Sequence, residues 1–255
     1  MMHTAQIELA EKGFSKYFMH LEDKIKEADI AVANMEFTLA GQPYSGYPAF
    51  SAPDEYAEYL AESGFDMIGI DNSEEMLEIA MEKRAESGLD ILYLLQDMRE
   101  FELYGTVKGV VSICDSMNYI LDDEDLLDVF KLVHNYLDNE GIFIFDMKTM
   151  HEYANVMADN TFAEDREESS FIWENYYDEE EEINQYDLSI FVKEEDGRYR
   201  KYEETHLQRA YEQKCVEELI KESGLELLHV YDAFTRELPA EDSQRIYYVC
   251  RRPAR

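Results

Sequence analysis

The chain has no long apolar run. Hydrophobic residues make up 45% of its 255 residues, yet no stretch approaches the roughly 20 consecutive apolar residues that a membrane-spanning helix needs. Charged side chains are spread through the first twenty positions, which is not typical of a secretory signal peptide. We therefore expect a globular cytoplasmic protein without a transmembrane helix or a signal peptide.

Cysteine is scarce. Cys114, Cys215 and Cys250 lie far apart, without the paired spacing that indicates a disulfide framework or a zinc site. We expect all three to be small apolar residues of the core. We also expect no metal site, and His3 and His20 are interpreted as surface residues.

Positive charge is in short supply. Lysine and arginine total 23 against 58 aspartates and glutamates, which gives a formal net charge of -35. Such a surface repels phosphate backbones, so nucleic acid is not expected as a substrate or partner, and a cationic or neutral small molecule suits the chain better. The acidic run 178–182 is interpreted as a solvated turn, with a cation site as the alternative.

Apolar strands alternate with helices over the first 150 residues. This alternation predicts an α/β fold of the Rossmann-like, doubly wound kind, with a mostly parallel sheet. Ser73 should cap one of the helices, and Gly88 should end it. The expected strands are 29–36, 65–70, 89–95 with Gln96, Asp97 and Met98 at its end, 109–114 and 142–147. The expected helices are 7–26, about 52–63 with Ser51 as its cap, 73–87 and 123–137, with a turn at 138–141.

The pattern changes to strict alternation between residues 171 and 209, which predicts antiparallel strands with a hairpin turn at 194–197. We expect an antiparallel β insertion at about 160–210, after the fifth strand. Its aromatic and basic side chains either line a substrate pocket or pack the extra sheet. The candidates are Trp173, Tyr176, Tyr177, His206, Arg209 and Tyr211.

A strand, an acid and a helix follow one another at residues 65–77. Asp71 ends the apolar strand, and Ser73 opens a helix with two glutamates in its first turn. In nucleotide-binding α/β folds a carboxylate at this place binds the ribose hydroxyls of an adenosine-containing cofactor. The alternative is a solvated aspartate at a helix cap.

Residues 3–66 resemble the bacterial capsule-synthesis, poly-γ-glutamate-type family, which has a metallophosphatase-like fold. The stretch 33–36, "ANME", is similar to the Asn-Leu-Glu motif of that family. The metal-binding motifs of the family have no counterpart, since residues 67–76 read "MIGIDNSEEM" where its Ala-Asn-Asn-His motif belongs. We interpret the segment as a fragment that supplies a helix and a strand-loop-helix unit.

Residues 66–252 resemble class I S-adenosylmethionine-dependent methyltransferases, with a core at 67–252. Asp71 is similar to the ribose-binding acid of the family, and Asp97 and Met98 to the pair at its adenine site. The stretch 115–119, "DSMNY", is similar to the motif beside the methyl donor. The resemblance implies S-adenosylmethionine as cofactor, bound by Asp71, Asn72, Met76, Asp97, Met98 and Asp115, with a small-molecule acceptor lined by Asn118, Tyr119, Trp173, His206, Arg209 and Tyr211.

The chain departs from this family in one motif. Class I methyltransferases carry a Gly-x-Gly-x-Gly turn after the first strand, because only glycine lets backbone amides approach the cofactor closely. Residues 34–53 stand in its place, with Gly41 and Gly46 five apart. The bulky Tyr44, Tyr47 or Phe50 could occupy the space of the cofactor.

Three functions remain open from the sequence. The first is methyl transfer to a small molecule, which depends mainly on alignment and exclusion of water, with His206 or Asp115 as candidate bases. The second is a metallophosphatase relative of capsule synthesis. The third is an inactive chimera whose two parts meet near residue 66 and in which the altered loop has weakened cofactor binding. The oligomeric state is open.

Overall fold

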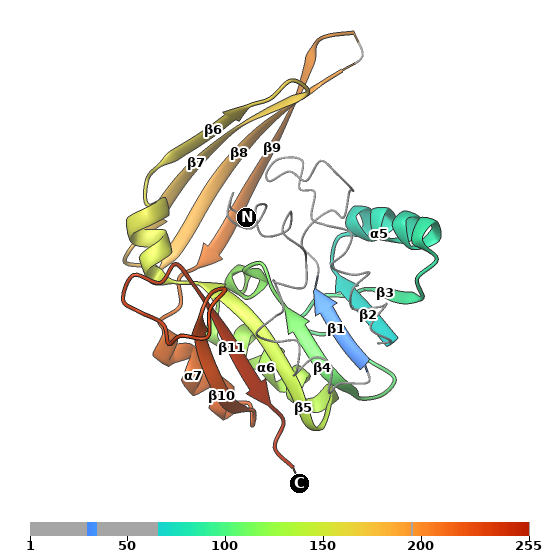
Figure 1. Cartoon of the computed structure of the whole chain (residues 1–255). Coiled ribbons are helices and arrows are strands. Elements are labelled where there is room, and N and C mark those ends of the chain that lie inside the picture. The colour runs from blue at the N-terminus through green and yellow to red at the C-terminus, as the bar shows by residue number, and fades with distance from the viewer. Residues whose placement is uncertain (1–29, 35–65, 195, 255) are drawn as a thin grey trace.

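The computed structural model describes residues 30–34, 66–194 and 196–254 (Figure 1). The expected helices at 7–26 and about 52–63 and the loop at 34–53 lie outside these residues, apart from Asn34 at the end of a strand. The strands are β1 (Ile30–Asn34), β2 (Asp66–Asp71), β3 (Ile91–Leu95), β4 (Val107–Ser112), β5 (Leu137–Lys148), β6 (Thr161–Asp165), β7 (Ser169–Asp178), β8 (Ile183–Lys193), β9 (Tyr199–Arg209), β10 (Glu226–Asp232) and β11 (Arg245–Arg251). The helices are α5 (Glu74–Ser87), α6 (Asp123–Tyr136) and α7 (Gln213–Glu222), with a 3₁₀ turn η1 (Ser116–Tyr119) and a π-helical turn η2 (Glu152–Met157).

Seven strands form the main sheet in the order β10-β11-β5-β4-β1-β2-β3. Neighbours from β5 to β3 run parallel, whereas β11 runs antiparallel to both β5 and β10. The chain winds outward from β1 through β2 to β3, and then returns to the other side of β1 with β4 and β5. The expected Rossmann-like, mostly parallel sheet is confirmed, and its order reverses between β1 and β4, where such sheets bind ligands.

The capsule-like segment contributes strand β1 to the centre of this sheet. Ala31 to Ala33 lie opposite residues 67–69 of β2 and 109–111 of β4. Asn34 pairs with Ser112, so β1 and β4 end at the same edge.

The main core lies between the sheet and the helices α6 and α7. Leu126 and Phe130 of α6 are fully buried against Phe143 and Phe145 of β5, whose rings stack at 4.8 Å. Apolar residues three and four apart on α6 form one face, as its sequence predicts.

The second sheet, β6-β7-β8-β9, is antiparallel and rises from one end of the main sheet (Figure 1). It follows β5, so the expected antiparallel insertion is confirmed. Gly197 turns the β8–β9 hairpin with a φ of 81° and donates to the carbonyl of Glu194. On one face, successive cross-strand rows hold Trp173, Leu188 and Glu204, and then Tyr186 and His206.

Two local predictions were wrong. Strand β4 ends at Ser112 rather than at residue 114, because Cys114 and Asp115 adopt left-handed backbone conformations with φ of 68° and 59°. The expected turn at 138–141 is an irregular part of β5, which begins at Leu137 and shifts register against β4. Glu140 takes the left-handed conformation there, with a φ of 63°. No helix in the described ranges is long and apolar enough to span a membrane.

Candidate functional site

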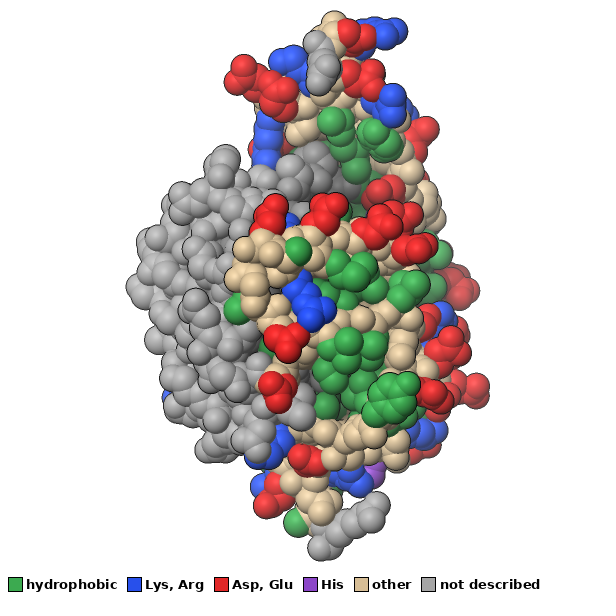
Figure 2. All heavy atoms as spheres, turned by 90° about the vertical axis from the view of Figure 1, so that its right-hand side faces the viewer, with side chains coloured by type: hydrophobic (Ala, Val, Ile, Leu, Met, Phe, Trp, Pro, Cys, Tyr) green, Lys and Arg blue, Asp and Glu red, His purple; other side chains and the backbone are tan. Residues whose placement is uncertain are grey.

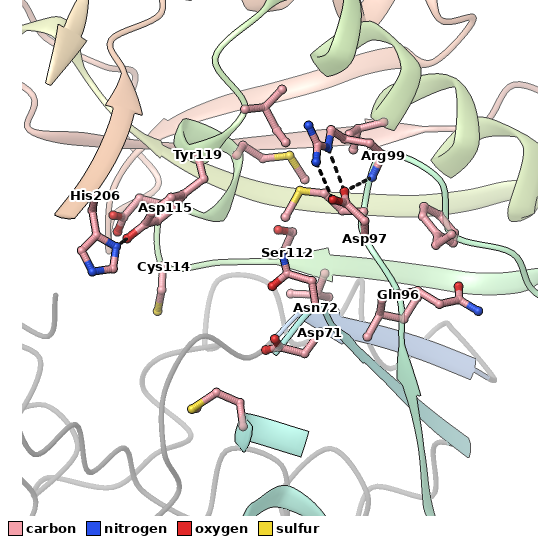
Figure 3. Close-up of a pocket in the computed structure, with 18 of the residues that line it drawn as sticks. Asp71, Asn72, Gln96, Asp97, Arg99, Ser112, Cys114, Asp115, Tyr119 and His206 are labelled. Atoms are coloured by element: carbon pink, nitrogen blue, oxygen red, sulfur yellow. Dashed lines mark hydrogen bonds and ion pairs between the residues drawn. The ribbon is translucent and has the colours of Figure 1, made fainter. Parts of the chain in front are cut away.

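A cavity of about 470 Å³ opens at the carboxyl ends of β2, β3 and β4 and continues under the antiparallel sheet. Figure 3 shows Tyr119 and His206 toward one side and Gln96 and Arg99 toward the other, with Asp71 and Asn72 between them. Apolar side chains line much of the wall between them, including Ile70, Met98, Phe101, Val110, Met117, Val129, Val133 and Phe143.

Asp71 stands where β2 passes into α5. One carboxylate oxygen, Oδ1, accepts a hydrogen bond from the backbone N–H of Ser73 at 2.8 Å. The Ser73 hydroxyl accepts from the N–H of Met76 and thereby caps α5. Burial raises the pKa of Asp71, while the backbone N–H groups of Ser73 and Asn72 act against this rise. A carboxylate offers about four acceptor positions, so the two backbone N–H groups that the described residues supply leave room for a ligand in the cavity.

Asp97 follows β3 and lies beside Met98 in the cavity wall. Its carboxylate accepts from the guanidinium of Arg99 at 2.6 and 3.0 Å and from the Arg99 backbone at 2.8 Å. These hydrogen bonds hold the pKa of Asp97 below its ordinary value. A carboxylate offers about four acceptor positions, so Asp97 can accept one further hydrogen bond.

Ser112 lies in the wall where β4 ends. Its hydroxyl oxygen is buried and has no hydrogen-bond partner among the described residues. A buried hydroxyl without a partner carries a desolvation cost, and a ligand group in the cavity can remove that cost. Burial raises the pKa of the neighbouring Cys114 thiol to about 12, so this cysteine stays protonated near neutral pH and is a poor nucleophile.

A buried ion network closes the cavity behind Asp115. Lys148 lies 2.7 Å from one Asp115 oxygen, and Arg245 donates to the other at 2.5 Å and to Asp146 at 2.5 Å. Gln208 donates to Asp115 at 2.8 Å. Burial alone would raise the pKa of Asp115, but Lys148 and Arg245 outweigh it and hold the pKa well below the ordinary value. The carboxylate therefore stays ionised and is a weak base.

Asn118 and Arg209 join the two sheets rather than facing the cavity. The Asn118 side chain is fully buried, donates to the carbonyls of Lys148 and Arg209, and accepts from the N–H of Lys148. The Arg209 guanidinium donates to the carbonyl of Leu121 and pairs with Asp123 at 2.8 Å.

The far end of the cavity is aromatic. The rings of Tyr186 and His206 stack at 4.7 Å, and Trp173 lies 5.0 Å from Tyr186. The hydroxyl of Tyr119 lies 2.6 Å from that of Tyr186 and 3.1 Å from His206 Nδ1. On the other side of the imidazole, Nε2 lies 3.2 Å from a carboxylate oxygen of Glu204.

The structure brings most of the expected site residues to this one cavity and leaves the others outside. Tyr176 points away and is 57% exposed. Tyr177 stacks on Tyr153, and Tyr211 donates to the carbonyl of Ile120. The expected residues in the cavity wall are Asp71, Asn72, Met76, Asp97, Met98, Asp115, Tyr119, Trp173 and His206; those that do not line it are Asn118, Arg209, Tyr211, Tyr176 and Tyr177.

Sequence reasoning missed Lys148, Tyr186 and Glu204 in the wall and Arg245 behind it. For Tyr186 and Glu204 a signal was present, because they alternate in step with Trp173 and His206 on adjacent strands. Within the described ranges no three His, Cys, Asp or Glu side chains form a metal-binding group.

Two family models match the chain. The bacterial capsule synthesis protein PGA_cap model matches residues 1–73, and a methyltransferase domain model matches residues 55–141. The solved structure of an S-adenosylmethionine-dependent methyltransferase from Clostridium acetobutylicum superposes with a TM-score of 0.81 at 24% identity, over 96% of this chain and 94% of that one.

Two sequence relatives extend the match. A proposed methyltransferase of Geobacillus sp. (strain WCH70), GWCH70_2453, is 31% identical over 78% of this chain and 80% of its own length. A proposed methyltransferase of Bacillus subtilis (strain 168), YqeM, is 39% identical over 74% of this chain and 76% of its own length. The identity and coverage of these relatives agree with the methyltransferase domain match and with the fold of S-adenosylmethionine-dependent methyltransferases. The chain therefore belongs to the S-adenosylmethionine-dependent methyltransferase family.

Proposed function

We propose that this methyltransferase acts on a small molecule bound under the β6–β9 sheet, with the cofactor at the carboxyl ends of β2, β3 and β4. The observation that carries the proposal is the continuity of one cavity from Asp71 to His206. A donor and an acceptor placed at its two ends would share a wall that excludes water. Alignment and exclusion of water supply much of the rate in such transfers.

The residues at the strand ends fit an adenosine-containing cofactor. Asp71 has acceptor positions for the ribose hydroxyls beyond those that the Ser73 and Asn72 backbones use, and Asp97 has one for the adenine amino group. Met98 and Phe101 offer apolar surface to the ring. The unpartnered hydroxyl of Ser112 is a further polar group that the bound cofactor would satisfy.

The cofactor supplies an electrophilic methyl group on a sulfonium. His206 would take the proton that the acceptor loses. When Nε2 carries the imidazole hydrogen, it donates to Glu204, and Nδ1 then accepts from the Tyr119 hydroxyl. Glu204 thus fixes the tautomer, and Tyr119 connects the base to the cavity. Asp115, the other candidate base, would instead hold Lys148 and Arg245 in place behind the acceptor.

The remaining parts of the proposal concern organisation. Residues 1–66 form a capsule-like segment, and residues 67–252 form the methyltransferase core, with the acceptor-covering insertion at about 160–210. A net charge of -35 disfavours nucleic acid as the acceptor. We place the enzyme in the cytoplasm, where S-adenosylmethionine is supplied.

Calorimetric titration with S-adenosylhomocysteine tests the cofactor site. Asp71→Asn keeps an oxygen for the Ser73 N–H and removes the charge that the ribose hydroxyls meet. We expect affinity to fall about 10- to 100-fold, since hydrogen bonds to charged groups contribute about 1.5–3 kcal/mol. Asp90→Asn is the matched control, because the Asp90 side chain is 97% exposed and forms its ion pair with Arg84, away from the cavity lining. Equal affinities of the two folded variants would refute the assignment.

A further inference from the structure

The described lining of the whole cavity has an excess of negative charge. The described lining carries four carboxylates, from Asp71, Asp97, Asp115 and Glu204, and only two lysine or arginine side chains. Both of these cations are already paired: Lys148 with Asp115 at 2.7 Å and Arg99 with Asp97 at 2.6 Å. An anionic acceptor would therefore find no available counterion among the described lining residues.

The sequence that follows strand β1 carries no cation either. Strand β1 ends at Asn34, on the edge where Ser112 ends β4. The stretch 35–65 that follows contains no lysine or arginine. The net charge of -35 also raises the local concentration of cations and lowers that of anions around the molecule.

Several groups at the acceptor end favour a positive charge. Aromatic faces carry negative electrostatic potential and attract ammonium ions, and Trp173, Tyr119 and Tyr186 all line this end. Glu204 lies in the same wall with 52% of its side chain exposed. Among the described residues its carboxylate contacts His206 at 3.2 Å through one oxygen, so the other oxygen can meet an ammonium ion.

From these charges and rings we infer that the acceptor is a small amine that binds as its ammonium ion. This inference rests on the proposed methyl transfer and names the substrate class for it. The ammonium group gives one proton to His206 and becomes a neutral amine. The nitrogen lone pair then forms the N–C bond to the methyl group, while the S–C bond breaks and its electron pair stays on sulfur. The products are a methylated ammonium ion, S-adenosylhomocysteine and an imidazolium that returns its proton to water.

The chain has one tryptophan, Trp173, and it lies at the acceptor end of the cavity. Its fluorescence therefore reports directly on ligands there. Benzylamine, benzyl alcohol and benzoate form a matched series, since they share a ring and differ in charge. Each probe is titrated into the full chain, with and without S-adenosylhomocysteine. We expect benzylamine to change the fluorescence saturably and to bind at least about tenfold more tightly than benzyl alcohol, with benzoate the weakest.

Glu204→Gln should reduce the preference for benzylamine over benzyl alcohol by about tenfold, because it removes the charge that meets the ammonium ion. Glu203→Gln is the control, since alternate residues of a strand face opposite sides and Glu203 pairs with Lys201 at 2.6 Å. It should leave the preference unchanged.

Benzoate binding as tightly as benzylamine, a flat response to benzylamine, or an unchanged preference in Glu204→Gln would each overturn the inference. The proposed cofactor site is judged separately, by calorimetry with S-adenosylhomocysteine. Loss of amine binding with intact cofactor binding would count against the amine class alone.

Discussion

Replacing Arg245 by Met removes the cation that joins two buried carboxylates. Arg245 is 8% exposed, and its guanidinium donates to Asp115 and Asp146 at 2.5 Å each. In Arg245→Met, Asp115 keeps Lys148, but among the described residues Asp146 keeps only the backbone N–H of Asp115 as a hydrogen-bond donor. Removing one partner of a buried ion pair costs about 3–5 kcal/mol, because the other charge stays buried without compensation.

The expected loss in the free energy of unfolding is large enough to measure by urea unfolding monitored by circular dichroism. Thermal unfolding should show it too: for a chain of this size a loss of about 1 kcal/mol lowers the midpoint temperature by roughly 2–4 °C, so the variant should melt roughly 6–20 °C lower. Arg251→Met is the matched control, since it lies on the same strand β11 and its pair with Glu226 is solvent-exposed. Its loss should stay below about 1 kcal/mol.

A second substitution separates the buried charge from the lost packing. Adding Asp146→Asn to Arg245→Met removes the uncompensated carboxylate, so the double variant should be more stable than Arg245→Met alone. The reasoning is refuted if Arg245→Met lowers the free energy of unfolding no more than Arg251→Met does. It is also refuted if adding Asp146→Asn makes Arg245→Met less stable, because the network would then not act through charge compensation.

Two further predictions concern the same end of the sheet. Ser112→Ala removes a buried hydroxyl that has no hydrogen-bond partner among the described residues. The free energy of unfolding should therefore stay equal or rise by about 1 kcal/mol, and calorimetry should show weaker binding of S-adenosylhomocysteine. A clear loss of stability would contradict this prediction. The pKa of Asp115 is depressed in the folded state, so its contribution to stability is present above the unfolded pKa of about 3.9 and is lost as the pH falls below it. Urea unfolding should therefore show the gap between the wild type and Arg245→Met narrowing below about pH 4; a constant gap would contradict the assignment.

The cavity wall at the strand ends was predictable because its signals are local. Asp71, Asp97 and Asp115 each follow a short apolar run, and the carboxyl ends of parallel strands meet at one edge of the sheet. Asp71 also precedes a helix that Ser73 caps. Placing these acids near one another needed only the order of strands and helices.

The role of Asp115 was not predictable in the same way. A carboxylate after a strand has the same local sequence whether it meets a ligand or an ion pair. Its partners Lys148, Gln208 and Arg245 lie 33, 93 and 130 positions further along the chain. The register between β5 and β11 brings Lys148 opposite Arg245, and no local pattern encodes that register.

The acceptor end of the cavity could be predicted from the sequence only in part. Strict alternation predicted the strands. It also predicted that alternate residues of each strand lie on one face of the sheet, so that Trp173 and His206 could lie on the same face. Which residues of β8 lie opposite them depends on the turns that join β8 to β7 and to β9. With Ile183 opposite Asp178, Leu188 lies opposite Trp173, and with Ile183 opposite Arg209, Tyr186 lies opposite His206. A slip of one residue would have turned Tyr186 to the other face.

Strand β1 shows why the fold and the chemistry of this chain need separate tests. A parallel strand pairs through backbone hydrogen bonds, so an apolar segment of suitable length fills the central place whatever family it resembles. The side chains described around the cavity come from residues 70–206, within the methyltransferase-like part of the chain. The residues that follow β1 have two glycines five apart in place of the Gly-x-Gly-x-Gly turn. The adenosine recognition that we propose for Asp71 and Asp97 can therefore persist even where contacts to the methionine part of the cofactor have changed.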